Sequence, residues 1–240
     1  KMARNAIGKA SFAQAEEEEF WTKASSYDQR QRKPQWIYSY DFNSNLLFRI
    51  HLTTRLKAKL SLHTFVPQYG TVWCELPLAK LCFTGGVEIG VDVRLRVDYI
   101  DTLSEFAHTQ KPDMLTARYS HASAYYDNYL YCIGGSNSDS RSINNCERFD
   151  ITLEIWEALE PLPQACTETS VIVLEESRCL FTLGGICIEG ELNLIQRLSI
   201  GDLTWDILKL ALPSPSQIMP CFKLDESQVY FVESKRLFSF

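Results

Sequence analysis

The chain has 240 residues, of which 45% are hydrophobic and 22% charged, and its formal net charge is −6 at pH 7. This length suits one large domain or two small ones, and the composition excludes a disordered chain. No apolar run of about 18 residues is present, which predicts no transmembrane helix, and the acidic balance argues against nucleic-acid binding because phosphate recognition needs a basic surface.

The first 35 residues differ in composition from the rest and are predicted to form a helical or flexible N-terminal arm. They are rich in Ala, Lys, Gln and Glu, lack the alternation of a strand, and reach a proline at position 34. The run of four glutamates at 16–19 is interpreted as a solvated helix face, with protein docking as a second interpretation. The arm has seven Lys and Arg against five Asp and Glu, so the remaining body carries the acidic excess.

The body, residues 36–240, is predicted to consist of short antiparallel strands in a repeated unit. The clearest unit has strands at 119–126, 129–133, 143–151 and 155–159. A tight turn is expected at Asp127-Asn128, because these short side chains tolerate a positive φ angle, and a polar loop is expected at 136–141. Four such strands would make one small sheet.

Glycine marks the repeat. Only 11 glycines occur, and six of them form three pairs at intervals of 49 and 50 residues. The pairs are Gly85-Gly86, Gly134-Gly135 and Gly184-Gly185. A pair of glycines allows a positive φ angle and a close approach of the backbone to a neighbouring sheet.

Two columns of larger side chains recur with the glycines. The third strand of each unit carries Tyr99, Phe149 or Leu198, and a large ring follows seven residues later at Phe106, Trp156 or Trp205. Such a ring offers apolar area for packing between adjacent sheets. A four-stranded sheet cannot bury both of its faces alone, so the units must stack on one another, and radial stacking makes a β-propeller.

The pattern resembles the kelch repeat, whose period is about 50 residues. The match is strongest at 118–122, 130–135, Phe149-Asp150 and Trp156, and it extends over residues 65–235. The resemblance implies an all-β, kelch-type β-propeller.

About four blades are expected, at 69–113, 118–163 and 168–213, with the fourth made from 217–240 and 36–53. The outer units depart from the pattern, since Phe106 replaces the usual Trp in the first and Glu233-Ser234 replaces Gly-Gly in the fourth.

Two interpretations of the chain ends stay open. The strands expected at 36–42 and 46–52 could join the C-terminal hairpin in one composite blade, which would close a ring of four. Alternatively, the two ends belong to separate blades of a larger ring. The second is favoured because kelch-like proteins usually have more than four blades.

The eight cysteines and four histidines predict no metal, cofactor or catalytic site. No CxxC pair occurs, and no cysteine pair lies beside a histidine at zinc-ligand spacing. Cys82 and Cys132 are interpreted as repeat-equivalent core thiols, and buried reduced cysteines predict a cytoplasmic protein. His121, just before a first strand, is interpreted as a structural residue bonded to a loop carbonyl.

The loops that follow the Gly-Gly pairs are the predicted partner-binding site. Equivalent loops of a propeller gather on one face, and a rigid scaffold that presents exposed loops is suited to binding. The residues singled out are Glu88, Asn137, Asp139, Arg141, Glu189 and Glu191. The other interpretation is that these loops only connect strands.

The resemblance to kelch proteins implies a non-catalytic protein-interaction module, an adaptor or scaffold, because most such proteins bind other proteins. The expected partner is a protein, with no nucleic acid and no membrane. The alternative is a propeller enzyme acting on sugars, of the oxidase or of the mutarotase and epimerase type. An enzyme would need convergent carboxylates or a metal cluster at the channel mouth, whereas an adaptor would present a loop face of mixed polarity.

Overall fold

The computed structural model describes residues 36–41, 46–51, 54–61, 65–88, 92–102, 107–215, 221–225, 228–233 and 236–239. The arm predicted at 1–35 lies outside these residues. The chain divides into two compact units, Lys1–Val66 and Pro67–Phe240. In the described part, no helix has the length and apolarity needed to cross a membrane.

The first unit contains one antiparallel sheet with the strand order β1-β2-β3. Its strands are β1 (Trp36–Asp41), β2 (Leu46–His51) and β3 (Lys57–Ser61). Leu47 in the central strand is fully buried. The first two strands were predicted from the sequence, whereas β3 was not, because its alternation of Lys with Ala and Leu is short and mostly polar.

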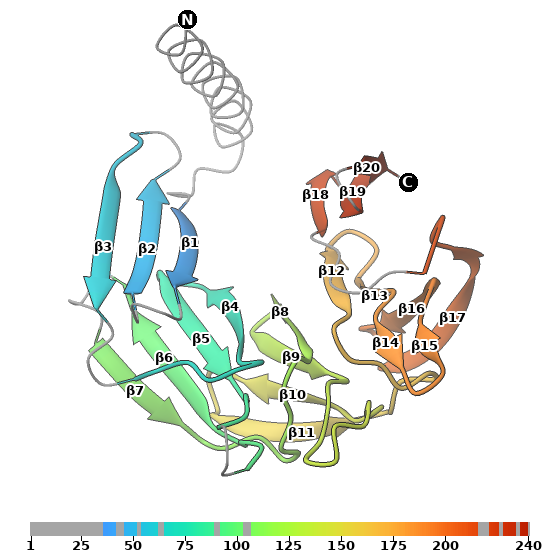
Figure 1. Cartoon of the computed structure of the whole chain (residues 1–240), viewed down its shortest axis with the longest axis horizontal. Helices are drawn as coiled ribbons and strands as arrows, with labels where there is room; N and C mark the ends of the chain where they lie inside the picture. Colours follow the sequence, from blue (N-terminus) through green and yellow to red (C-terminus); the bar gives the residue numbers. More distant parts are fainter. Residues whose placement is uncertain are drawn as a thin grey trace, which may run out of the picture. The chain divides into compact units, whose positions relative to one another are not determined.

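The second unit contains three four-stranded antiparallel sheets, here called blades 1 to 3 (Figure 1). Blade 1 has β4 (Val72–Leu76), β5 (Lys80–Thr84), β6 (Val97–Asp101) and β7 (Ala107–Lys111). Blade 2 has β8 (Ala122–Tyr126), β9 (Tyr129–Ile133), β10 (Cys146–Asp150) and β11 (Ile155–Leu159). Blade 3 has β12 (Ser170–Leu174), β13 (Cys179–Leu183), β16 (Leu194–Ser199) and β17 (Thr204–Ala211).

Two smaller sheets complete the second unit. The hairpin of β14 (Ile186–Cys187) and β15 (Gly190–Glu191) is inserted in blade 3. A last sheet contains β18 (Cys221–Asp225), β19 (Gln228–Glu233) and β20 (Arg236–Ser239). Among the described strands, β1–β3 and β18–β20 form separate sheets. The composition of the fourth blade and the closure of the ring stay predictions.

Burial explains the order of strands within a blade. The second strand is apolar almost throughout, as in the sequence Tyr-Leu-Tyr-Cys-Ile of β9, and four of its five residues are buried. A strand covered on both faces reads as a continuous apolar run. The fourth strand is mostly exposed: in β11 the half-buried Trp156 lies between exposed neighbours, and the strand forms the edge of its blade opposite the first strand.

The first strands of successive blades lie side by side. β8 contacts β4 and β12, and β12 contacts β18. One apolar cluster joins blade 1 to blade 2 through Leu76 and Val97 on one side and Phe149 on the other. A second joins blade 2 to blade 3 through Tyr131 and Leu198. The blades therefore bury their faces against one another, as the repeat predicted.

The predicted boundaries of blade 2 hold for its second and fourth strands. Its first and third strands begin three residues later than expected, because Tyr119 and Ile143 bond to the loop region at Ser136 and Gly135 instead of continuing a ladder. The predicted turn is confirmed, since Asp127 and Asn128 have φ angles of 47° and 70°, as a two-residue hairpin turn of type I′ requires.

The Gly-Gly pairs have the conformation that the sequence predicted. Gly134 and Gly135 have φ angles of 59° and 104°, and the other two pairs repeat these values closely. A Cβ atom on Gly134 would collide with the carbonyl oxygen of Cys166, which belongs to the segment entering blade 3. The pair is thus required both by its backbone angles and by the close approach of the next blade.

The strand register corrects two of the predicted columns. Ile100, rather than Tyr99, lies opposite the central leucine of its blade, as Phe149 and Leu198 do. The residue opposite Ile100 in the fourth strand is His108, because the turn before β7 is one residue longer than in blades 2 and 3. Phe106 itself lies outside the described residues.

Cys82 and Cys132 are not equivalent, which corrects the sequence interpretation. Cys82 lies three residues before its Gly-Gly pair and Cys132 lies two before its own. Successive side chains of a strand point to opposite faces, so this offset places them on opposite faces of their blades. Both are buried in the cluster between blades 1 and 2, where they approach from the two sides.

Candidate functional site

The three loops predicted to bind a partner begin at equivalent points of the blades. Each loop leaves a Gly-Gly pair and bonds to the segment that enters its own blade. The amide of Val87 donates to the Tyr69 carbonyl oxygen at 2.9 Å, and Ser136 and Tyr119 exchange two such bonds. In blade 3 the amide of Thr167 donates to the carbonyl oxygen of Ile186 at 2.9 Å.

These entering segments also bond to one another. The amide of Ser120 donates to the Gly70 carbonyl oxygen at 2.7 Å. The Ser120 carbonyl oxygen accepts the amide of Glu168 at 2.9 Å and the hydroxyl of Thr167 at 3.1 Å. The bases of the three loops are therefore joined in one hydrogen-bonded band, here called the loop rim and defined by residues 69–70, 119–120 and 167–168 with Val87, Ser136 and Ile186.

The blade 1 loop carries an internally neutralised charge. The carboxylate of Glu88 forms an ion pair with the guanidinium of Arg94 across the loop, and both side chains are partly exposed. The amide of Glu88 also donates to the Asp92 carbonyl oxygen. Of the predicted partner-binding residues, Glu88 is thus the one already used in an ion pair.

The blade 2 loop is held together by Asn137. The Oδ1 atom of Asn137 accepts the amides of Asp139 and Arg141, both at 3.1 Å. Ser140 has a φ angle of 56°, which gives the loop its tight bend. The Asn137 side chain is used within the loop, whereas Asp139 and Arg141 are exposed at its surface with opposite charges.

The blade 3 loop is the β14–β15 hairpin. Ile188 at its tip is 81% exposed. The thiol of Cys187 donates to a carboxylate oxygen of Glu189 at 2.9 Å, and Glu191 is exposed in β15. The tip of this hairpin therefore presents a large apolar side chain.

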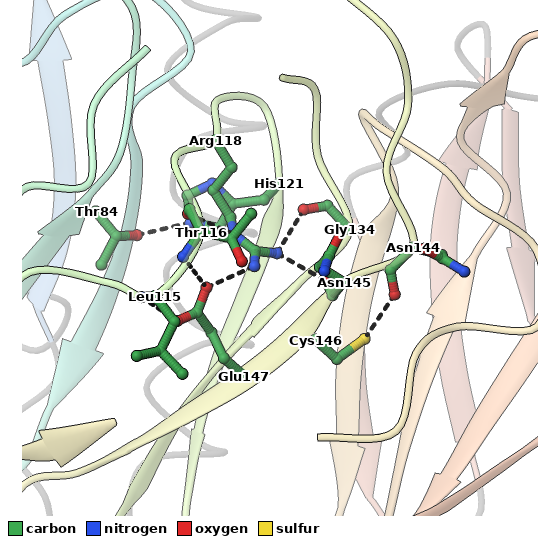
Figure 2. A network of polar contacts seen from close by, with 10 residues as sticks. All are labelled: Thr84, Leu115, Thr116, Arg118, His121, Gly134, Asn144, Asn145, Cys146 and Glu147. Atoms are coloured by element: carbon green, nitrogen blue, oxygen red, sulfur yellow. Dashed lines mark hydrogen bonds and ion pairs between the residues drawn. The ribbon is translucent and has the colours of Figure 1, made fainter. Parts of the chain in front are cut away.

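A buried ion pair beneath the rim supports the segment between blades 1 and 2 (Figure 2). The Nη2 atom of Arg118 donates to Glu147 Oε1 at 2.5 Å, and Nη1 donates to the carbonyl oxygens of Gly134 and Asn145, both at 2.8 Å. Arg118 is fully buried, and Glu147 is 1% exposed. Glu147 also accepts the amide of Leu115 at 2.6 Å, so the pair ties the connecting segment to blade 2.

In blade 3 the residue at the position of Glu147 is Gln196, and it also ties the connecting segment to its blade. Gln196 Oε1 accepts the amide of Gln164 at 2.8 Å, and its Nε2 donates to the carbonyl oxygen of Gln164 at 3.1 Å. In blade 1 the position is held by Asp98, which is bonded to Arg96 and His108. This column was not predicted from the sequence, although a polar residue recurs every 49 residues, two places before the apolar residue of the third strand.

His121 joins blades 1 and 2. Its Nε2 atom lies 2.8 Å from the Thr84 hydroxyl at the end of β5, and the ring is buried. Its partner is therefore a hydroxyl of the preceding blade and not the loop carbonyl expected from the sequence. Burial, with a smaller effect of the Arg118 charge, lowers the pKa of His121 well below its ordinary value, so the ring is neutral.

The predicted ring residues described in the structure pack between strands. The Trp156 ring lies 5.0 Å from that of Phe149, and its Nε1 donates to the Pro112 carbonyl oxygen at the end of blade 1. Trp205 lies opposite Leu198 and packs against the cluster between blades 2 and 3.

The cysteines whose side chains the structure describes have free thiols, and most of them are buried. Burial raises the pKa of Cys74, Cys146 and Cys166 to about 12. Protonated thiols in apolar packing are poor nucleophiles. Among the described residues, no group of three or more His, Cys, Asp and Glu could hold a metal ion.

Comparison with known proteins agrees with this architecture. Residues 117–163, which cover blade 2 and its flanking segments, match the family model of the Kelch motif. The chain is a kelch-repeat protein.

Several kelch proteins are similar to part of this kelch-repeat protein. Kelch-like protein 38 of Rattus norvegicus is 33% identical over 92 residues, which is 38% of this chain and 16% of the relative. An F-box/kelch-repeat protein of Arabidopsis thaliana is 35% identical over 97 residues, 39% of this chain and 36% of the relative. Kelch-like protein 25 of Xenopus tropicalis is 29% identical over 145 residues, 57% of this chain and 24% of the relative. The kelch-repeat chain therefore spans between about one sixth and one third of these relatives.

A solved structure shares the fold. The structure of YjhT superposes with a TM-score of 0.72 over 83% of this chain and 69% of that one, at 12% sequence identity. The described part is thus all-β and propeller-like.

Proposed function

We propose that the chain is a protein-interaction module, an adaptor or scaffold, whose partner contacts the loop rim and the three loops that rise from it. The observation that carries the proposal is the hydrogen-bonded band from Gly70 through Ser120 to Glu168, because it joins the bases of the three loops. Loops held by a rigid scaffold are the usual carriers of binding function. The relatives named Kelch-like and F-box/kelch-repeat support this class of function.

The charges of the loops suit a protein surface. Asp139 and Arg141 bring both signs to one exposed loop, and Ile188 adds an apolar side chain on the next. Mixed polarity of this kind is typical of protein interfaces. The alternative of an enzyme acting on sugars has no supporting observation here, since the strongly shifted pKa values belong to buried groups between and within the blades, among them His121 and Cys82.

We also propose a reducing compartment such as the cytoplasm. The free thiols of the described cysteines support this location. A disulfide bond between any two of these cysteines in the protein isolated from cells would contradict this location.

The interaction proposal is tested by reversing the charges of the blade 2 loop. An Asp139→Lys/Arg141→Glu double variant leaves Asn137, which holds the loop, in place. Affinity purification from cells with quantitative mass spectrometry should show a severalfold loss of at least one reproducible partner.

The matched control is Leu153→Ser, in the turn at the other end of β10, where Leu153 is 65% exposed. This variant should keep the partners that the loop variant loses. Equal partner sets for the wild type, the loop variant and the control would overturn the proposal for this loop.

A further inference from the structure

The β14–β15 hairpin has an exposed apolar tip, whereas the blade 2 loop at 136–141 is polar throughout. Ile188 is 81% exposed, whereas Ile186 at the base is half-buried and Cys187 is buried. A large apolar side chain held in water gains stability when another surface covers it. Covering the tip with a partner's apolar side chains would therefore stabilise a complex.

The hairpin is held rigidly. Ile186 pairs with Glu191 and Cys187 with Gly190, and the amide of Leu192 donates to the Gly185 carbonyl oxygen at 2.8 Å. Thr167 bonds the base of the hairpin to the rim through two backbone hydrogen bonds. A preorganised tip loses little conformational entropy when it is covered, which favours binding.

The hairpin is also negatively charged and lacks an internal counter-charge. Glu189 and Glu191 follow Ile188 along the hairpin, and no Lys or Arg occurs between positions 186 and 195. No described residue forms an ion pair with either carboxylate. In contrast, Glu88 is paired with Arg94 in the blade 1 loop.

We infer that the β14–β15 hairpin binds an extended segment of a partner protein in which apolar side chains are flanked by Lys or Arg. The apolar side chains cover Ile188, and the basic groups meet Glu189 and Glu191. Charge complementarity selects a basic segment over an acidic one, because two acidic surfaces repel each other. This inference rests on the proposed function of the loop rim and names the chemistry of its partner.

The test uses a phage-displayed library of random peptides selected against the immobilised full chain. The selected peptides should combine apolar residues with Lys or Arg. Their affinity should fall at least about tenfold in Ile188→Ser and in Glu189→Lys/Glu191→Lys, and it should weaken as ionic strength rises. The matched control is Leu78→Ser, because Leu78 is 79% exposed at the other end of β5 and should not affect binding.

Three results would overturn the inference. The first is selection of acidic or uncharged peptides, and the second is equal affinity for the wild type and Ile188→Ser. The third is peptides that lose affinity in the Asp139→Lys/Arg141→Glu variant but not in the hairpin variants; it would support the proposed function of the rim while excluding the hairpin. Peptides indifferent to all of these loop variants would count against both proposals. Thermal melting of each variant checks that the exposed substitutions leave the fold intact.

Discussion

Arg118 and Glu147 form a buried ion pair that fastens the segment between blades 1 and 2, with Nη2 and Oε1 separated by 2.5 Å. The guanidinium also donates to three backbone carbonyl oxygens, and the carboxylate accepts two backbone amides. Each charge is therefore compensated in a place from which water is excluded. Removing one partner leaves the other charge buried alone, which is far more costly than losing an exposed pair.

We expect Glu147→Gln to lower the free energy of unfolding by about 3 kcal/mol, because an amide cannot neutralise Arg118. Urea unfolding followed by tryptophan fluorescence measures the change. The matched control is Glu157→Gln, which breaks the exposed pair with Arg148 and should cost less than about 1 kcal/mol. Equal effects of the two substitutions would contradict the assignment of a buried pair.

Gly134→Ala should destabilise the chain by about 2 kcal/mol or more. The φ angle of 59° is unfavourable for alanine, and the new methyl group would collide with the Cys166 carbonyl oxygen of the next blade. Gly201→Ala is the control, since a Cβ atom there meets nothing within 4 Å. The free energies of unfolding of the two variants should differ clearly, and similar values would show that the close approach between blades 2 and 3 is not required.

A stabilising substitution is expected at Arg178. This exposed residue has a φ angle of 51° in the turn between β12 and β13. Arg178→Gly should raise the free energy of unfolding by about 0.5–1 kcal/mol, because glycine adopts this conformation without a Cβ clash. Arg178→Ala keeps the Cβ atom and should give no such gain. The two melting temperatures, measured side by side, decide whether backbone strain is the cause.

His121 should make the stability of the chain depend on pH below about 6.5. The ring is neutral in the fold because burial lowers its pKa well below the ordinary histidine value of about 6.5, while in the unfolded chain it titrates near that value. Unfolding therefore takes up a proton in this range, and the free energy of unfolding falls by up to about 1.4 kcal/mol per pH unit as the pH drops below 6.5.

The measurement is urea unfolding between pH 7.5 and pH 5 for the wild type and His121→Gln. Glutamine can still bond to Thr84 but does not titrate, so the variant should show a shallower slope in this window. Carboxylates with lowered pKa values, such as Asp150 and Asp202, lose their stabilising effect only at lower pH. An identical slope in both proteins would show that His121 does not titrate on unfolding.

The features that depend on the conformational preferences of neighbouring residues were predicted correctly from the sequence. The turn at Asp127-Asn128 and the Gly-Gly pairs follow from the conformational preferences of those residues, and the structure has both as predicted. The strands at 129–133 and 155–159 follow from their apolar and aromatic content. The third strand of the N-terminal sheet, β3, was missed because polar residues dominate it.

Sequence spacing alone does not identify the equivalent positions of the blades, because it does not show the strand register. The spacing predicts Tyr99 in the column of Phe149 and Leu198, yet Ile100 occupies it. One additional residue in the following turn moves His108 into the place of the tryptophans. Cys82 and Cys132 were aligned although they differ by one position, and one position reverses the face of a strand. The sequence pattern does not show where a single residue has been inserted. The insertion is evident only when backbone hydrogen bonds define which residues of two strands pair.

The sequence by itself determined that this is a repeat of short antiparallel strands, because glycine pairs, turns and large rings report on local backbone conformation and on the need to bury a face. Only the tertiary structure decided which groups meet between blades. The Arg118–Glu147 pair, the contact of His121 with Thr84, and the hydrogen-bonded rim at Ser120 all join residues of different strands or blades. Such contacts depend on strand register and on the close approach of two sheets, and a single residue type, read alone, carries no record of the group that it will face.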